Sequence, residues 1–154
     1  MKQESGRSMI EMMGVLAIMG VITVGAIAAI SSAMNLQKRN SVNDEVLQIV
    51  TQVRSIYNQY DDYSSINSAT VFGAIGMSNQ NPYGGTYEVS VNPSNSRQFI
   101  VSITGLSQSD CQAIVAKAWT DSVGYEMSGH TQSGASGSCS NANGENVVQI
   151  TYGE

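Results

Sequence analysis

Charged residues are scarce in this sequence. Lysine and arginine account for 7 of its 154 residues, and aspartate and glutamate for 12; together this is about half the charged fraction usual in soluble domains. From residue 40 onward, three basic residues stand against ten acidic ones, a net charge of −7. This balance excludes an exposed basic surface for nucleic acid on the C-terminal part of the chain. An apolar content of 42% excludes disorder for most of the chain.

Residues that hold metals or carry out catalysis are equally few. With two cysteines, one histidine and no CxxC motif, the chain has no ligand set for a structural zinc site. His130 lies in a segment rich in glycine and serine, and the nearby GASGSC does not match the GxSxG pattern of a nucleophile elbow. Asp61, Asp62 and Glu145 lack the spacing of a known calcium loop. We therefore expect no enzymatic activity, no metal site and no cofactor.

The longest uncharged run lies near the N-terminus. It covers the 25 residues from Met12 to Leu36, and as a helix it would measure roughly 37 Å, enough to cross a hydrocarbon core of about 30 Å. A removable secretory signal peptide is the alternative, but its apolar part is typically about 7–15 residues long and ends at a cleavage site of small residues. The run here is longer and carries an acidic residue, Glu11, at its entrance. A retained membrane span fits these features better.

Small residues are spread along this apolar run. Gly14, Gly20 and Gly25 are dispersed through it, and Gly25, Ala29 and Ala33 recur at a spacing of four. That spacing aligns side chains on one face of a helix. Small residues on one face allow a second helix to approach closely, although glycine and alanine are also common in membrane helices generally.

Glu11 belongs to a recognisable motif. A carboxylate at the mouth of an apolar helix is costly, so it either lies at the headgroup boundary or needs a specific partner once the helix leaves the membrane. Residues 6–16, GRSMIEMMGVL, resemble the processing motif of type IV prepilins and type II secretion pseudopilins. In that family a short charged leader ends in glycine, and a hydrophobic helix follows with glutamate at its fifth mature position. The first mature residue is usually Phe, Met or Leu, whereas here it is Arg7.

The resemblance implies a division of the chain into three parts. Residues 1–6 would be a leader that a prepilin peptidase removes by cutting after Gly6 and methylating the new amine at Arg7. Residues 7–35 would form a hydrophobic helix that is first transmembrane and then part of a filament core, and residues 36–154 a globular pilin domain. Glu11 would neutralise the α-amine at Arg7 of an adjacent subunit.

The apolar residues beyond Arg39 follow a helical period. They recur in steps of three and four, and they are Val42, Val46, Leu47, Ile49, Val50, Val53, Ile56, Tyr57 and Tyr60. Asp44 and Glu45 fall mainly outside this face. No proline or glycine occurs between Ala26 and Tyr60. One helix from about Met9 to Tyr60 is therefore predicted, apolar all round in its first half and on one face in its second.

The remaining sequence predicts a small α+β domain with an antiparallel sheet. Its expected elements are a short helix within residues 68–77, a turn at 81–85, strands at Thr86–Val91 and Gln98–Thr104, a helix from Ser107 to about Ala118 or Trp119, a loop at Ser128–Asn146 and a strand at Val147–Tyr152. The first two strands are separated by turn-forming residues and most simply form an antiparallel pair.

Cys111 and Cys139 are the only cysteines. The predicted leader and span would place both outside the cytoplasm, where disulfides persist, and a bond between them would restrain the polar loop. Two free thiols are the alternative. A C-terminal region bounded by a disulfide is a familiar feature of pilins, and residues 105–111, GLSQSDC, resemble the segment before the first disulfide cysteine of type IVb pilins. Position 28 is alanine, where many type IVa pilins and pseudopilins have proline.

The resemblance therefore implies a structural subunit of a type IVb-like pilus. Its partners would be further copies of itself, the prepilin peptidase and assembly machinery, and the inner membrane before assembly; the assembled pilus would be extracellular. A type II secretion pseudopilin is the alternative within the family, although major pseudopilins commonly end in an acidic calcium-binding loop that this chain lacks. A single-span protein whose domain binds a partner as a monomer is the alternative outside it.

Overall fold

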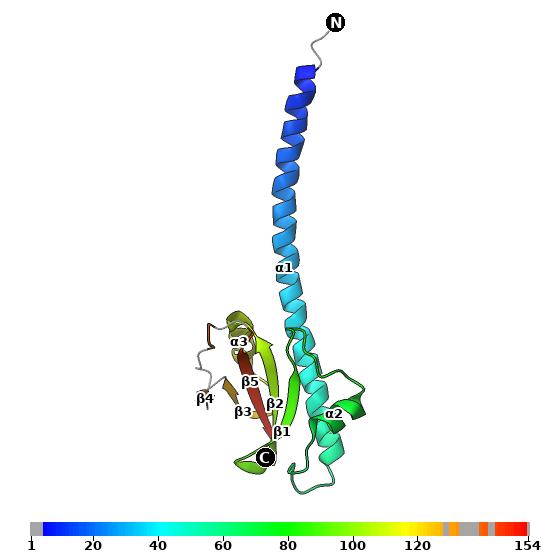
Figure 1. The fold of residues 1–154 in the computed structure, drawn as a ribbon, viewed down its shortest axis with the longest axis vertical. Coiled ribbons are helices and arrows are strands. Elements are labelled where there is room, and N and C mark those ends of the chain that lie inside the picture. The colour runs from blue at the N-terminus through cyan, green and yellow to red at the C-terminus, as the bar shows by residue number, and fades with distance from the viewer. Residues whose placement is uncertain (1–4, 128–129, 133–138, 142–143, 154) are drawn as a thin grey trace. The chain divides into compact units, whose positions relative to one another are not determined.

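The computed structural model describes residues 5–127, 130–132, 139–141 and 144–153. Its fold is α+β, as predicted, with a long N-terminal helix and a small antiparallel sheet (Figure 1). The helices are α1 (Ser5–Tyr57), α2 (Ser68–Ile75) and α3 (Gln108–Val115). The strands are β1 (Tyr87–Asn92), β2 (Asn95–Leu106), β3 (Ser122–Met127), β4 (His130–Gln132) and β5 (Asn146–Gly153). The chain divides into two compact units at Lys38 and Arg39, close to the predicted division between residues 35 and 36.

Helix α1 confirms the prediction of one uninterrupted helix, with shifted ends. It begins at Ser5 rather than near Met9, so it starts before the proposed cleavage position. It ends at Tyr57, and Arg54 in its last turn complements the negative end of the helix dipole. The prediction that Tyr60 lies on the buried face is wrong, because the helix has ended and position 60 no longer follows its period; Tyr60 is exposed.

The second half of α1 packs on the sheet through one face. Val46, Ile49 and Val53 are fully buried in a core that also contains residues of β1, β2 and β5. Leu47 was expected on this face but is exposed, because it lies one residue, or about 100°, beyond Val46 around the helix. Glu45, expected outside the apolar face, is half-buried instead.

The sheet has the strand order β1-β2-β5-β3-β4 within the described residues, and every neighbouring pair is antiparallel. The predicted β1–β2 hairpin is confirmed, with Val89 opposite Val101. Strand β5 adds to the other side of β2, and its side chains alternate between buried and half-buried positions. This alternation gives the sheet one face toward the core.

Several boundaries differ from the predictions. Strand β2 begins at Asn95, inside the stretch expected to be a turn, and α3 ends at Val115, before Trp119. Strand β3 was not predicted, because its sequence SVGYEM contains a glycine and shows little alternation; it forms through pairing with β5. Strand β4 lies within the segment 128–146 predicted to be loop, which is wrong for those residues. Other parts of that segment lie outside the described residues.

The turn before β1 is fixed by Asn81. Its side-chain oxygen accepts hydrogen bonds from the backbone of Tyr83 and Gly85, each at 3.0 Å, and its amide donates to the Thr104 carbonyl at 2.8 Å. This places Gly85 directly against Gly105, whose φ is +77°. A Cβ added to Gly85 would lie 2.0 Å from the Thr104 carbonyl oxygen. The predicted turn at 81–85 is therefore confirmed, and it requires glycine where the two backbones cross.

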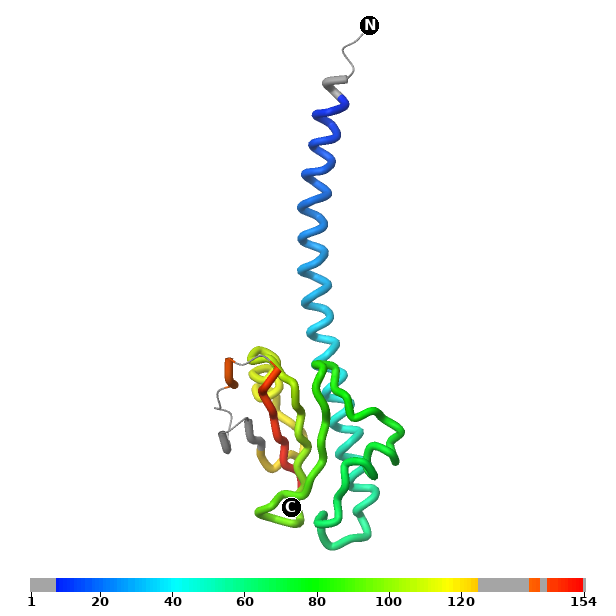
Figure 2. Tube along the Cα trace, in the orientation of Figure 1, coloured from blue at the N-terminus to red at the C-terminus, as the bar shows by residue number. Residues whose placement is uncertain are grey.

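Helix α2 covers the free edge of β1. The side chain of Asn67 caps the helix by accepting from the Ala69 N–H at 2.8 Å. The Ser68 hydroxyl then donates to the Val89 carbonyl and accepts from the Val89 N–H, both at 2.8 Å. Figure 2 shows the segment between α1 and β1 running beside the last turns of α1. One serine thus occupies both backbone groups of Val89, at the middle of an edge strand that could otherwise pair with a foreign strand.

Candidate functional site: the exposed apolar helix and the disulfide region

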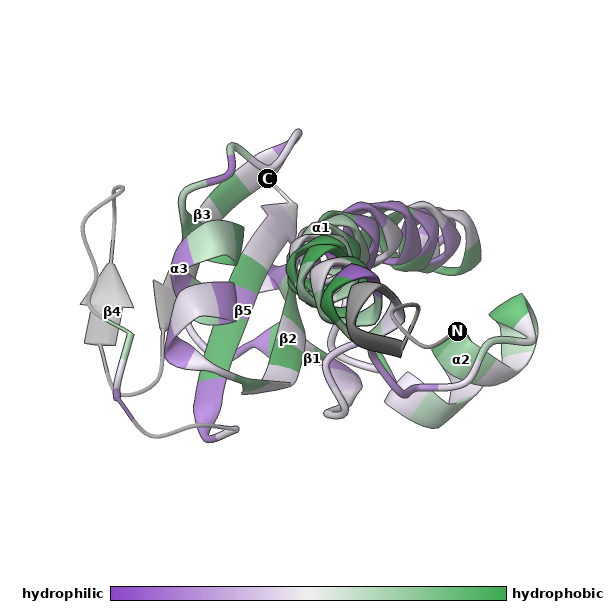
Figure 3. Ribbon diagram, turned by 90° about the horizontal axis from the view of Figure 1, so that it is seen from above, coloured by the Kyte–Doolittle hydropathy of each residue, from purple (hydrophilic) through white to green (hydrophobic). Residues whose placement is uncertain are grey.

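The first part of α1 exposes all of its apolar side chains. From Met9 to Leu36, the large hydrophobic residues have exposed fractions between 51% at Val15 and 75% at Val21. Figure 3 colours this part of the helix mostly as hydrophobic. Burial of one such side chain is worth about 1.5–3 kcal/mol. A continuous apolar surface of this size therefore requires lipid or another protein to cover it.

The polar groups in the first part of α1 are also compatible with an apolar environment. The helix from Ser8 to Tyr57 is long and apolar enough to cross a membrane. Its backbone polar groups are bonded within the helix, as lipid requires. Thr23 Oγ1 donates to the Met19 carbonyl at 2.7 Å, and Ser32 Oγ donates to the Ala28 carbonyl at 3.1 Å. These two hydroxyls consequently need no partner outside the helix.

The small residues lie on an open helix surface. No heavy atom stands within 4 Å of a Cβ added to Gly14, Gly20 or Gly25. Ala29 and Ala33 are exposed as well. The helix therefore presents this row of small side chains without anything packed on it, in a form that a neighbouring helix could approach closely.

The residues of the processing motif lie at the start of α1. Gly6 and Arg7 have helical backbone. The side chain of Arg7 lies outside the described part of the structure, as do residues 1–4 of the proposed leader. Glu11 is exposed. Among the described side chains, no basic group forms an ion pair with its carboxylate.

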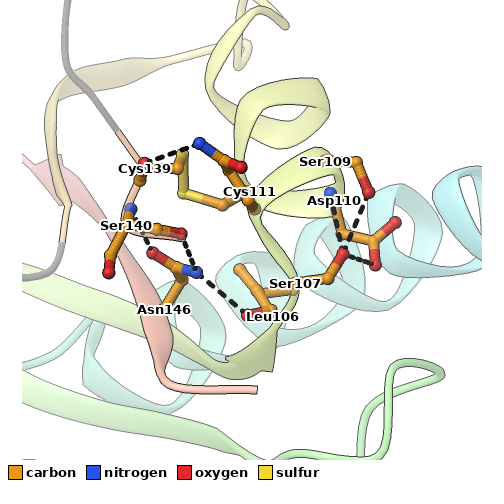
Figure 4. The surroundings of a disulfide bond; sticks show 9 residues. Leu106, Ser107, Ser109, Asp110, Cys111, Cys139, Ser140 and Asn146 are labelled. Carbon is orange, nitrogen blue, oxygen red and sulfur yellow. Dashed lines mark hydrogen bonds between the residues drawn. A yellow bond between two sulfur atoms is a disulfide. The ribbon is translucent and has the colours of Figure 1, made fainter. Parts of the chain in front are cut away.

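The two cysteines form a disulfide, which excludes the alternative of two free thiols. Cys111 on α3 and Cys139 have Cα atoms 5.9 Å apart, and both residues are buried (Figure 4). Helix α3 begins with Ser107 as its N-cap, whose hydroxyl accepts from the Asp110 N–H at 3.2 Å and donates to its carboxylate at 2.6 Å. This start resembles the capping signal predicted from SQSD. The disulfide therefore ties the polar segment to a firmly capped helix.

Asn146 holds the same segment through hydrogen bonds, a role that sequence reasoning missed. Its side chain is fully buried. The amide donates to the Leu106 carbonyl at 3.2 Å and to the Ser140 carbonyl at 3.1 Å, while its oxygen accepts from the Ser140 N–H at 2.8 Å (Figure 4). A buried amide of this kind acts as a polar clamp beside the disulfide. Nothing distinguishes Asn146 in the sequence from the other asparagines of the loop.

The remaining titratable groups do not gather into a cluster that could hold a metal ion within the described residues. No group of three or more His, Cys, Asp or Glu side chains comes together there. Asp62 accepts hydrogen bonds from the hydroxyl of Ser64 at 2.6 Å and from its backbone N–H at 3.1 Å. These bonds hold the pKa of the Asp62 carboxyl below its ordinary value. The side chain of His130 lies outside the described part of the structure.

No protein-family model and no curated protein matches the sequence.

Proposed function

We propose that this chain is the structural subunit of a type IVb-like pilus. The proposal is carried by one observation: the motif at residues 6–16 lies at the start of a helix whose large apolar side chains are exposed from Met9 to Leu36. An ordinary membrane anchor needs neither glycine at position 6 nor glutamate at position 11. Enzymatic activity and nucleic-acid binding form no part of the proposal.

The proposed mechanism is a change of surroundings for the apolar helix. A prepilin peptidase removes residues 1–6. The mature chain then remains in the inner membrane, with its C-terminal domain outside the cytoplasm, until assembly. The assembly machinery then moves the helix from lipid into a core made of the same helices from other copies. Because lipid and protein both cover apolar side chains, little hydrophobic free energy is lost in this exchange. The row of Gly25, Ala29 and Ala33 would permit close helix contacts.

Glu11 gives this transfer its specificity. In an apolar filament core, an unpaired carboxylate is strongly unfavourable. Pairing with the α-amine at Arg7 of an adjacent copy would remove that penalty and fix the axial position of each new subunit. The exposed position of Glu11 supports this role. The disulfide supports a final location outside the cytoplasm.

The test is replacement of Glu11 by alanine in cells that have no other copy of the gene. We expect Glu11→Ala to be processed and inserted like the wild type, but to reduce surface filaments, counted by negative-stain microscopy, at least about tenfold. Glu88→Ala, which removes an exposed carboxylate from β1, is the matched control and should assemble normally.

The same experiment separates the alternatives. Normal filaments in Glu11→Ala would contradict the charge-pairing mechanism. A wild type that never forms surface fibres, but is retained as short periplasmic assemblies, would favour the pseudopilin. A processed or unprocessed monomer that remains in the membrane would favour a single-span binding protein.

A further inference from the structure

A cleft lies beside the C-terminal end of α1, entirely within the unit that begins at Arg39. Its lining includes Arg54 and Tyr57 of the last helical turns, Tyr60 and Asp62 of the turn that follows, and Arg97 of β2. Neither the proposed processing, nor the membrane span, nor the filament core uses these side chains. Their combination of aromatic rings with charged groups of both signs is typical of a small-molecule or glycan site rather than of a packed core.

The exposed aromatic ring of this cleft is held in place from behind. Tyr60 is 62% exposed, and its ring centroid lies 5.7 Å from that of Tyr57. Tyr57 lies 6.0 Å from Tyr63, which in turn lies 4.8 Å from the fully buried Phe99. The Tyr57 hydroxyl also donates to the Ser65 carbonyl at 3.1 Å. A chain of contacts thus links Tyr60 to the core. The Tyr60 ring is therefore ordered before a ligand stacks on it.

The polar groups of the cleft are balanced in charge. Arg54 forms a 3.4 Å ion pair with Asp121, and Arg97 faces a cleft that also contains Asp61 and Asp62. Hydrogen bonds from Ser64 lower the pKa of Asp62, and its carboxylate acts as an acceptor. The two guanidinium groups of the lining are matched by two lining carboxylates, and Arg54 is also paired with Asp121 outside the lining, so no net positive field remains for a phosphate or a nucleotide. They suit a neutral ligand that both donates and accepts many hydrogen bonds.

We propose that this cleft binds neutral oligosaccharides. A pyranose ring has an apolar face of C–H groups, which would stack on Tyr60, and a rim of hydroxyls. The hydroxyls would donate to Asp62 and accept from Arg97, so each kind of lining residue has a matching group on the sugar. The proposal stands independently of filament assembly, since a monomer would carry the same cleft.

The test uses the full chain, purified in a detergent without a sugar headgroup, on a printed array of neutral, sialylated and sulfated oligosaccharides. We expect binding to neutral hexose or N-acetylhexosamine glycans. Tyr60→Ala should lower the binding signal about tenfold or more, whereas Tyr60→Phe, which keeps the ring, should stay within about threefold of the wild type. Arg97→Gln should also weaken binding.

Leu47→Ala is the matched control, because Leu47 is an exposed apolar residue of the same helix that does not line the cleft. It should bind like the wild type. Equal unfolding midpoints for Tyr60→Ala and the wild type, followed by Trp119 fluorescence, would show that the variant is folded. Absence of binding to any neutral glycan, binding to acidic glycans alone, or a wild-type signal from Tyr60→Ala would each overturn the proposal.

Discussion

The hydroxyl of Tyr87 on β1 donates a 2.5 Å hydrogen bond to the carboxylate of Glu45 on α1. The Tyr87 ring is fully buried, and burial together with this bond raises the pKa of its phenol. Tyr152 offers a contrast on the same sheet. Its ring is also fully buried, but its hydroxyl has no hydrogen-bond partner among the described residues. Two chemically identical side chains thus differ in one bond.

This contrast predicts that the same substitution, tyrosine to phenylalanine, destabilises the domain at position 87 but not at position 152. Tyr87→Phe should lower the free energy of unfolding by about 1–2 kcal/mol, because it leaves a half-buried carboxylate without its donor. Tyr152→Phe should change it by less than about 0.5 kcal/mol or raise it, because the lost hydroxyl is buried and unpaired. Urea unfolding followed by the fluorescence of Trp119, the single tryptophan, measures both. Equal losses in the two variants would contradict the assignment.

Alkaline pH should weaken the domain through the same tyrosines. Burial raises the pKa of Tyr152 to about 12, from an ordinary value of about 10. Because the folded state then holds a proton that the unfolded state has lost, the free energy of unfolding is intact below about pH 10 and declines as the pH rises through about 12. Tyr152→Phe should make this decline less steep in urea midpoints measured across that range. Identical slopes in the variant and the wild type would count against the burial of this phenol.

The two glycines Gly85 and Gly73 should respond oppositely to alanine. Gly85→Ala places a Cβ against the Thr104 carbonyl. The two backbones must separate to relieve this clash, so we expect the free energy of unfolding to fall by about 3 kcal/mol. Gly73 lies inside α2 with nothing within 4 Å of its added Cβ. Gly73→Ala should therefore raise the free energy of unfolding by about 0.5–1 kcal/mol. A tolerated Gly85→Ala would show that the crossing is looser than described.

Removal of the disulfide should destabilise the domain without affecting membrane insertion. Cys111→Ser and Cys139→Ser should each lower the free energy of unfolding by about 2–5 kcal/mol. The double variant should lower it by little more than either single variant, because all three lose the same bond. The amount of this protein in cells reports the effect, and so does the filament yield if the proposed function holds. Fully additive defects, or two alkylatable thiols in non-reduced wild-type protein, would refute the pairing.

Sequence reasoning predicted the structure best where one strong local signal was sufficient to define an element. The uninterrupted helix between Ala26 and Tyr57 follows from hydrophobic period and the absence of proline and glycine. The turn at 81–85 and the α3 cap follow from residues that bond to their own neighbours in the chain.

It was least informative where structure depends on distant partners. Strand β3 exists because β5 lies beside it, and neither the Tyr87–Glu45 bond nor the Asn146 clamp spans neighbouring residues. The cleft likewise combines residues from α1, the turn after it and β2. Only the fold brings these groups together, so period and composition could not reveal them.

The central claim is that this chain is cut after Gly6 and assembled into a surface filament. The intact mass of the subunit in fibres sheared from the cell surface tests it most directly. We predict a chain that begins at Arg7 and retains the bond between Cys111 and Cys139. A chain that begins at Met1 or beyond Ala33, or sheared fibres that contain none of this protein, would contradict the claim.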